Sequence, residues 1–177
     1  MNQPELNPRE YSIDEVLRDG GPIHLRAIRP SDKDLLFEHF SGLSQDSRYT
    51  RFFGAKRTFS DNEVAFFVNV DFAKHVALVV VAQEDGHAAI IAGGRYVVGQ
   101  PGSAEVAFVV IDKYQGQGIG ALLLRHLAKI ARDTGLKELT AEVLPENIPM
   151  LKVFEKSGLK LSTRRESGAV HVVLQLA

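Results

Sequence analysis

The chain has 177 residues, a formal net charge of −1, 45% hydrophobic and 24% charged residues, and no cysteine. These values favour one globular domain and argue against intrinsic disorder, a basic nucleic-acid-binding surface, disulfides and thiolate metal sites. Met1–Glu5 lacks the basic and apolar segments of a signal peptide, and no apolar run reaches the ~20 residues that span a bilayer. We therefore expect a cytoplasmic protein with no membrane or nucleic-acid partner.

The start of the chain is rich in Pro, Asn, Asp and Glu, and residues 1–21 are predicted to form an N-terminal tail or arm ahead of one domain at residues 22–177. One short helix is expected within this arm, from Ser12 to Leu17. Ile23–Ile28 alternates apolar and polar residues like a half-buried strand, which Pro30 ends.

Three helices are predicted next. Ser31 and Asp34 occupy capping positions for the first helix, whose apolar residues recur at helical spacing: Leu35, Leu36, Phe40 and Leu43. The second covers Ser44–Phe53. The third follows a capping box at Ser60–Glu63 and has an apolar face formed by Val64, Phe67 and Val68.

The period then changes to that of strands. Val76–Ala82 is a β-branched run, and a turn at Glu84–His87 joins it to a second strand that passes through Ile90 and Val98, which predicts an antiparallel hairpin. Gly93-Gly94 within the second strand indicates a bulge or a close approach of another group. Ala104–Ile111 follows as a central, buried strand.

The last third alternates helices and strands. Apolar residues recur on one face of a helix that begins at Ile119 and stops at Gly135. The remaining elements are a strand at Leu139–Leu144, a helix at Ile148–Ser157 and a final strand at Ala169–Gln175. This order predicts a mixed α/β (α+β) fold with a largely antiparallel front half, and it differs from that of a doubly wound sheet.

A glycine-rich segment, Gln115-Gly116-Gln117-Gly118-Ile119-Gly120, joins the central strand to the helix. Such a turn presents free backbone N–H groups at the positive end of the helix dipole, which is an anion site, although glycines there can also serve only a tight connection. Ala121-Leu122 excludes the P-loop, which needs Lys followed by Ser or Thr. The dinucleotide fingerprint matches formally, with Glu138 or Glu142 as the ribose acid, but the preceding antiparallel strands argue against it.

The strand Ala104–Val110 followed by Gln115, Gly118 and Gly120 resembles the core motif of the GNAT superfamily of N-acetyltransferases, which has the pattern Q/R-x-x-G-x-G/A. Downstream residues resemble the second motif of that family: Asn147, Met150, Leu151, Phe154, Gly158 and Leu159. The resemblance extends over residues 23–177. It implies the GNAT fold, with a mixed, largely antiparallel central sheet flanked by helices, and acetyl-CoA as the cofactor, released as coenzyme A.

By this resemblance, the backbone of Val109, Val110 and Ile111 would pair with the pantetheine arm, and the amides of Gln115, Gly116, Gln117, Gly118, Ile119 and Gly120 would hold the pyrophosphate. Ala121, Asn147 and Phe154 complete the predicted cofactor site. The six histidines show no metal-ligand spacing, so no metal is expected.

The segments Ile28–Asp32 and Gly42–Phe53 resemble the GNAT domain of bacterial protein-lysine acetyltransferases of the Pat type. This implies transfer of acetyl to a lysine of a protein substrate. Two alternatives stay open: acetylation of a small amine or a peptide N-terminus, and a non-catalytic acyl-CoA-binding sensor module. A purely structural alternative for the aromatic cluster at residues 49–53 is a helix that packs its rings into the core.

Glu105 is predicted to be the general base. A lysine amine with a pKa near 10.4 is neutral in only about one molecule in 2,500 at pH 7, so transfer needs a proton acceptor. Glu105 is the sole ionisable residue of its strand, at a place where the family often keeps a catalytic glutamate; solvation of an exposed strand end is the alternative. Phe154 stands where the family often has a tyrosine acid. Either Tyr114 or Tyr96 serves instead, or the thiolate leaves without an acid.

Overall fold

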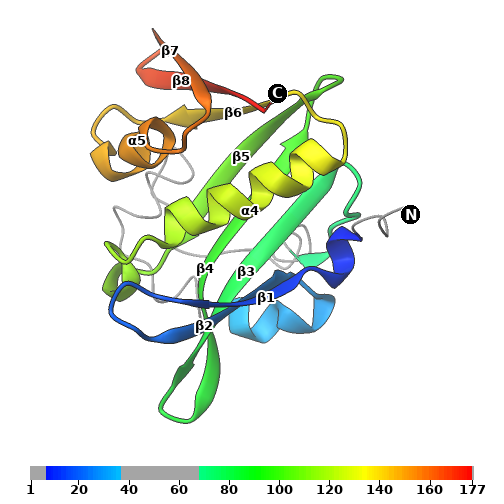
Figure 1. Cartoon of the computed structure of the whole chain (residues 1–177), viewed down its shortest axis with the longest axis vertical. Helices are drawn as coiled ribbons and strands as arrows, with labels where there is room; N and C mark the ends of the chain where they lie inside the picture. Colours follow the sequence, from blue (N-terminus) through cyan, green and yellow to red (C-terminus); the bar gives the residue numbers. More distant parts are fainter. Residues whose placement is uncertain (1–6, 37–67, 177) are drawn as a thin grey trace.

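The computed structural model describes residues 7–36 and 68–176, and its frame is an eight-stranded sheet in the order β1-β2-β3-β4-β5-β6-β8-β7 (Figure 1). All neighbouring strands are antiparallel except β5 and β6, which are parallel. The strands are β1 Ser12–Val16, β2 Pro22–Ala27, β3 His75–Glu84, β4 His87–Val98, β5 Ser103–Val110, β6 Glu138–Val143, β7 Lys160–Glu166 and β8 Ala169–Gln175. The predicted mixed architecture with a largely antiparallel sheet is confirmed.

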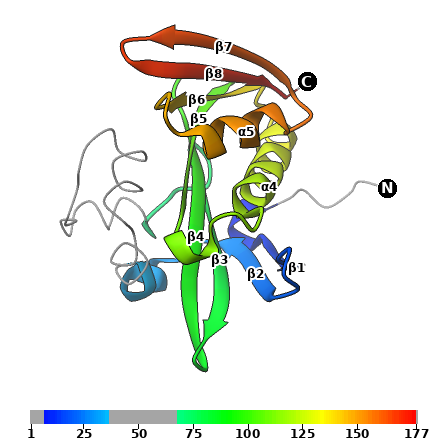
Figure 2. The ribbon, with the colours of Figure 1, turned by 90° about the vertical axis from the view of Figure 1, so that its left-hand side faces the viewer.

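The helices are α4 Ile119–Asp133 and α5 Ile148–Glu155, with short 3-10 turns η1 Pro8–Glu10, η2 Pro30–Asp32 and η3 Asp112–Tyr114. Figure 2 shows α4 and α5 on one side of the sheet and the segment that contains η2 on the other. In the described part of the chain, no helix is both long and apolar enough to cross a membrane.

The main core lies between the sheet and α4. Alternate residues of each strand point toward the helix, as the two-residue period of a strand requires, and α4 contributes its apolar stripe. The members from β6 and α4 are almost wholly inaccessible to solvent: Leu139, Ala141, Val143, Leu123, Leu127 and Ile130. Burying each large aliphatic side chain stabilises the fold by about 1.5–3 kcal/mol, so α4 is fixed firmly on the sheet.

A smaller apolar cluster covers the opposite face of β3 and β4. It includes Ile28, Leu36, Ala77, Val79 and Ile90. The segment that enters it is held by Asp32, whose carboxylate accepts two hydrogen bonds from the buried Arg26 guanidinium (2.8 and 2.7 Å) and one from the Arg29 backbone N–H (2.8 Å). Burial raises the pKa of Asp32, but these hydrogen bonds outweigh burial, so that its pKa lies below the usual value.

Two elements differ from the prediction at the edges of the sheet. The helix expected at Ser12–Leu17 is wrong, because this segment forms β1, which pairs antiparallel with β2. Its inward side has Tyr11, Ile13, Glu15 and Leu17 at strand spacing, and the charge of Glu15 conceals that alternation in the sequence. Strand β7 was not expected at all, because its mostly exposed, charged residues give no apolar period.

Two local features also shift. The capping interaction of the first helical segment uses Arg29 and Asp32 instead of Ser31 and Asp34. The irregularity in β4 falls next to Ile91, since Val80 pairs with Ala92 and Val81 with Ile90. Gly94 instead leaves room for the close approach of the Phe108 and Leu127 side chains, because a Cβ at this position would lie 2.8 Å from Phe108 Cδ1 and 3.1 Å from Leu127 Cδ1. The other hairpin, helix and strand predictions from residue 75 onward are confirmed to within two residues. Those for residues 37–67 lie outside the described chain.

Candidate active site

The glycine-rich loop leads into an α4 N-terminus that no side chain caps. Gly116 and Gly118 have φ values of +83° and +85°, in the left-handed region that disfavours other residues, and Gly118 is the N-cap. A serine or aspartate at this position would accept a hydrogen bond from a first-turn N–H, whereas glycine offers no acceptor. The N–H groups of Ile119, Gly120 and Ala121 therefore point outward without an intrahelical partner, at the positive end of the dipole.

Gln115 fixes the start of this loop. Its side-chain Nε2 donates a hydrogen bond to the Val110 carbonyl (3.1 Å), so the loop is tied to the end of β5. The Tyr114 N–H donates to the Ile111 carbonyl (3.0 Å) in the same turn. The side chain of Gln115 thus holds the loop in shape.

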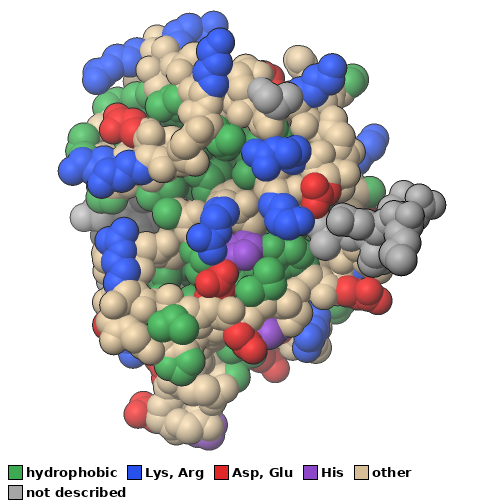
Figure 3. Space-filling model, viewed as in Figure 1, with side chains coloured by type: hydrophobic (Ala, Val, Ile, Leu, Met, Phe, Trp, Pro, Cys, Tyr) green, Lys and Arg blue, Asp and Glu red, His purple; other side chains and the backbone are tan. Residues whose placement is uncertain are grey.

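An open groove of about 470 Å³ lies beside the loop and along α4. Its walls come from the turn after β1, from α4 and from the end of α5, and its cationic side chains are Arg18, Arg125, Arg132 and Lys156. Among the described residues that line it none is acidic. Figure 3 shows Lys and Arg side chains gathered on this face of the molecule, over α4, α5 and β7. The groove therefore suits a ligand that carries several negative charges.

Arg18 is a groove residue that the sequence did not indicate. It lies in the turn between β1 and β2, its Nη1 is 3.5 Å from the Gly116 carbonyl oxygen, and its Nε would be 3.2 Å from a Cβ on Gly118. The guanidinium therefore lies directly against the glycine loop although 98 residues separate Arg18 from Gly116. The expected helix at Ser12–Leu17 hid this placement; only the pairing of β1 with β2 brings the turn here.

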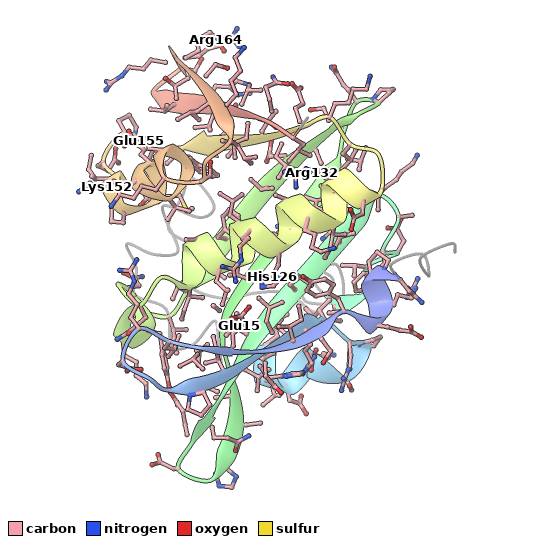
Figure 4. All side chains as sticks on the ribbon, in the orientation of Figure 1. Glu15, His126, Arg132, Lys152, Glu155 and Arg164 are labelled. Atoms are coloured by element: carbon pink, nitrogen blue, oxygen red, sulfur yellow. The ribbon has the colours of Figure 1, made fainter. Side chains whose placement is uncertain are left out.

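A buried network holds this N-terminal hairpin against α4. His126 lies 6% exposed on α4, and its Nε2 donates to the Glu15 carboxylate (3.0 Å) while its Nδ1 accepts from the Tyr11 hydroxyl. Figure 4 shows Glu15 and His126 directed toward one another. Arg125 also donates to Glu15 (3.1 Å). Burial lowers the pKa of His126, in keeping with the neutral tautomer that this network requires.

The sheet opens between β5 and β6. The two strands pair only at Ser103–Glu138, Ala104–Leu139 and Glu105–Thr140, although both strands continue. Glu105 thus marks the apex of a V-shaped opening, from which Val106–Val110 and Ala141–Val143 diverge. Its side chain is solvent-exposed and faces away from α4, because its neighbours Ala104 and Val106 belong to the core beneath the helix.

Of the three predicted backbone contacts at the end of β5, only Val110 faces this opening. The Ile111 N–H donates to the Ile91 carbonyl (3.0 Å), so that group is used within the sheet. In an antiparallel strand, the backbone N–H and C=O groups of successive residues point alternately to the two neighbouring strands. Those of Val109 therefore face β4, as the Ile111 N–H does, while those of Phe108 and Val110 face β6 and the opening. Phe108 therefore also directs backbone groups into the opening, and the sequence did not single it out.

The two predicted residues of α5 have structural contacts. Asn147 is the N-cap of α5, where its Oδ1 accepts from the Met150 N–H (3.4 Å). Phe154 is only 1% exposed, and its ring packs against Phe108 with centroids 6.2 Å apart. Phe154 therefore belongs to the main core beside β5, and Val153, one residue earlier, lines the groove.

Neither tyrosine considered as a general acid is well placed. Tyr96 is completely buried on the α4 side, and burial raises its pKa. Tyr114 donates its hydroxyl proton to Glu84 (2.6 Å), and burial together with this carboxylate raises its pKa to about 12. A proton held this tightly is not available to a departing thiolate. No group of three or more potential metal ligands occurs in the described residues.

Comparisons with known proteins agree with this geometry. The sequence profile of the Acetyltransferase (GNAT) domain matches residues 23–160. The solved GNAT domain of S. lividans PAT superposes with a TM-score of 0.83 at 36% identity, covering 93% of this chain and 96% of that one. Acetyltransferase PA5475 of Pseudomonas aeruginosa is 30% identical over 71% of this chain and 68% of its own length. Acetyltransferase Pat of Mycolicibacterium smegmatis is 32% identical over 80% of this chain, which spans 42% of that protein.

Proposed function

This chain belongs to the GNAT family of acetyltransferases, and we propose that it transfers an acetyl group from acetyl-CoA directly to a lysine side chain of a protein substrate. The observation that carries the proposal is the position of Glu105 at the apex where β5 and β6 separate, on the face opposite the basic groove. A thioester threaded through that opening would meet a carboxylate on its far side.

The residues of the groove fit coenzyme A. The N–H groups of Ile119, Gly120 and Ala121 would hold the diphosphate, as the uncapped helix start favours an anion. Arg18 and Lys156 would contact the phosphates from the two walls. The peptide groups of Phe108 and the N–H group of Val110 would pair with the amides of the pantetheine arm, because no strand occupies that side of β5 beyond Glu105 and the Val110 carbonyl already accepts from Gln115.

Glu105 would act as general base on the opposite face. Acetyl-CoA supplies the acetyl group as a thioester, and the acceptor nitrogen must lose a proton to become nucleophilic. Glu105 accepts that proton directly or through one water, and its exposure leaves room for either route. A correctly placed base contributes about 10²–10⁴ in rate, comparable with the handicap of a protonated lysine.

We further propose that the thiolate leaves without a protein acid. Phe154 has no ionisable group, and Tyr96 and Tyr114 retain their protons for the reasons given above. A thiol pKa near 8.5 makes the thiolate a tolerable leaving group at neutral pH. The lysine acceptor rests on the resemblance to Pat-type proteins at Ile28–Asp32 and Gly42–Phe53, the latter outside the described residues.

Calorimetry with acetyl-CoA and coenzyme A tests the groove, and an assay of free thiol release tests the reaction. The assay would use acetyl-CoA with a panel of lysine-containing proteins, peptides with free or blocked N-termini, and polyamines. We expect binding and turnover with lysine acceptors. Turnover only with free N-termini or polyamines would exclude the protein-lysine proposal, and binding without any turnover would indicate the sensor module.

A further inference from the structure

A second carboxylate borders the opening between β5 and β6. Leu139, Ala141 and Val143 of β6 point into the core beneath α4, so Thr140 and Glu142 face the other side, as Glu105 does. Glu105 pairs with Thr140, and Glu142 follows two residues later. A strand rises about 3.3 Å per residue and paired strands lie about 4.8 Å apart, so the Cα atoms of Glu105 and Glu142 are at least about 8 Å from each other, and the divergence of the strands after Thr140 adds to this.

His171 of β8 orients Glu142. The two residues are register partners in the β6–β8 pair, and the His171 Nδ1 forms a hydrogen bond with the Glu142 carboxylate. Arg164 of β7 is the register partner of His171 on the other side of β8, but its guanidinium forms an ion pair with Glu166 (2.8 Å). The Glu142 side chain remains 37% exposed, so it is both fixed in direction and accessible to an incoming group.

The pair is not needed to hold the strands together. β6 and β8 share six register pairs along their full lengths, and Val170, Val172 and Leu174 bury their side chains in the main core. A partly exposed hydrogen-bonded pair of this kind adds less than about 1 kcal/mol to that. The position of Glu142 is therefore better explained by what approaches the opening than by stability.

The acceptor arrives at this opening as an ammonium group, because an amine with a pKa near 10.4 is protonated at neutral pH. An ammonium group has three N–H donors, and Glu105 at the apex can engage only part of them. We propose that Glu142, oriented by His171, is a positioning residue that binds the acceptor ammonium from the β6 side of the opening and selects cationic acceptors. Glu142 only holds the ammonium group, while Glu105 takes the proton.

This inference rests on the proposed function, and it predicts a particular kinetic pattern. Glu142→Gln should raise the KM for a blocked peptide with one lysine about five- to tenfold, because it removes one partly exposed ion pair, while kcat and the KM for acetyl-CoA stay unchanged. Glu138→Gln is the matched control, since Glu138 lies on the same strand and face but at the paired end of β5 and β6. The control should behave like the unchanged protein.

His171 variants test the orienting hydrogen bond. His171→Ala should reproduce part of the KM increase, and His171→Asn should restore the native KM, because the asparagine amide can donate from nearly the position of Nδ1. A loss of kcat in His171→Asn would show instead that the imidazole moves a proton, which would overturn the assignment of a positioning role.

A binding measurement separates this inference from the proposed function. n-Butylamine, a protonated mimic of the lysine side chain, is titrated into the protein saturated with coenzyme A, and NMR follows the His171 imidazole. Binding that weakens five- to tenfold in Glu142→Gln but not in Glu138→Gln supports the inference even if no lysine peptide is acetylated. Equal binding by all three proteins, or no binding, overturns it, whereas acetylation of lysine peptides would still support the proposed function.

Discussion

The two faces of the sheet around β5 are built on different principles. On the α4 face, the proposed coenzyme contacts are mostly backbone N–H groups of one continuous segment, with Arg18 and Lys156 added at the rim. On the opposite face, the proposed functional groups are side chains from different strands, Glu105 of β5, Glu142 of β6 and His171 of β8, brought together by register. In this proposal, coenzyme binding depends on local chain geometry, whereas chemistry and acceptor choice depend on how the strands pair.

Glu105→Gln is the sharpest test of the difference between the two faces. It should lower kcat at least tenfold, and up to the 10²–10⁴ that a general base contributes, while acetyl-CoA affinity stays nearly intact because the proposed coenzyme groove lies on the other face. Steady-state kinetics and calorimetry on the same preparation measure both quantities. Glu138→Gln serves as the control on the same face. An unchanged kcat would remove the assignment of Glu105.

Gly118→Ala should have the opposite effect: coenzyme affinity falls, while kcat at saturating acetyl-CoA stays nearly intact. A φ of +85° costs a residue with a Cβ about 1–2 kcal/mol, and that Cβ would lie 3.2 Å from Arg18 Nε, so the loop is strained and the Arg18 guanidinium must give way. We expect coenzyme A to bind on the order of ten- to a hundredfold more weakly by calorimetry.

Gly135→Ala is the control for the strain in that variant. Gly135 has a φ of +92° after the other end of α4, and a Cβ there meets nothing within 4 Å. Both variants should lose similar thermal stability, but only Gly118→Ala should lose coenzyme affinity. If Gly135→Ala weakened binding equally, the loss would reflect general destabilisation and not the anion site.

Arg18→Gln should weaken coenzyme A binding by a smaller factor, about three- to tenfold, because the guanidinium is exposed and salt screens it. The variant should also show a weaker dependence of the dissociation constant on salt concentration. Arg164→Gln, which removes an exposed arginine of β7, should change neither quantity. A salt dependence identical to that of the native protein would show that Arg18 does not meet a phosphate.

The smallest effect on activity is expected at His75, which shares a cross-strand row with Val97 and Glu105 but is buried. Burial, and secondarily the charge of Arg95, lowers its pKa to about 4. The unfolded chain binds a proton near pH 6.5 and the folded chain only near pH 4, so unfolding free energy should fall as pH decreases between these values.

The size of that fall should be about 1–3 kcal/mol for His75, with His126 contributing in the same direction. Urea unfolding at pH 7 and pH 5 measures it, and His75→Gln should reduce the difference between the two pH values while leaving kcat at pH 7 unchanged. An identical pH dependence in His75→Gln would contradict the lowered pKa.

Much of the fold was predictable because it has strong local signals. The hairpin of β3 and β4, the glycine loop, α4 and β6 each follow from period, turn residues or caps. Strand β1 is not predicted because Glu15 occupies an inward position, where Arg125 pairs with its charge and His126 donates a hydrogen bond to it across more than a hundred residues of sequence. Strand β7 was missed because an edge strand can be charged on both faces and has no period to detect.

The residues of the candidate site likewise divide into those with a signal in the sequence and those without one. Glycines at positions 116 and 118 signal an anion loop because few other residues adopt a positive φ, and this requirement is visible in the sequence alone. Glu105 stands out as the one charge of an apolar strand. Arg18, Phe108 and Glu142 carry no such signal, since an arginine in a turn, a phenylalanine in a strand and a glutamate near a strand end are ordinary.

The sequence by itself determined most of the elements from residue 75 onward, the glycine loop and the kinds of groups that this loop and Glu105 provide, because these depend on neighbours within one turn or one strand. Only the tertiary structure decided that β5 and β6 part after Glu105, that Arg18 lies on the loop, and that Glu142 faces the same side as Glu105. Strand order and register are set by the common core that β2 to β6 and β8 form with α4, a condition that no single segment contains.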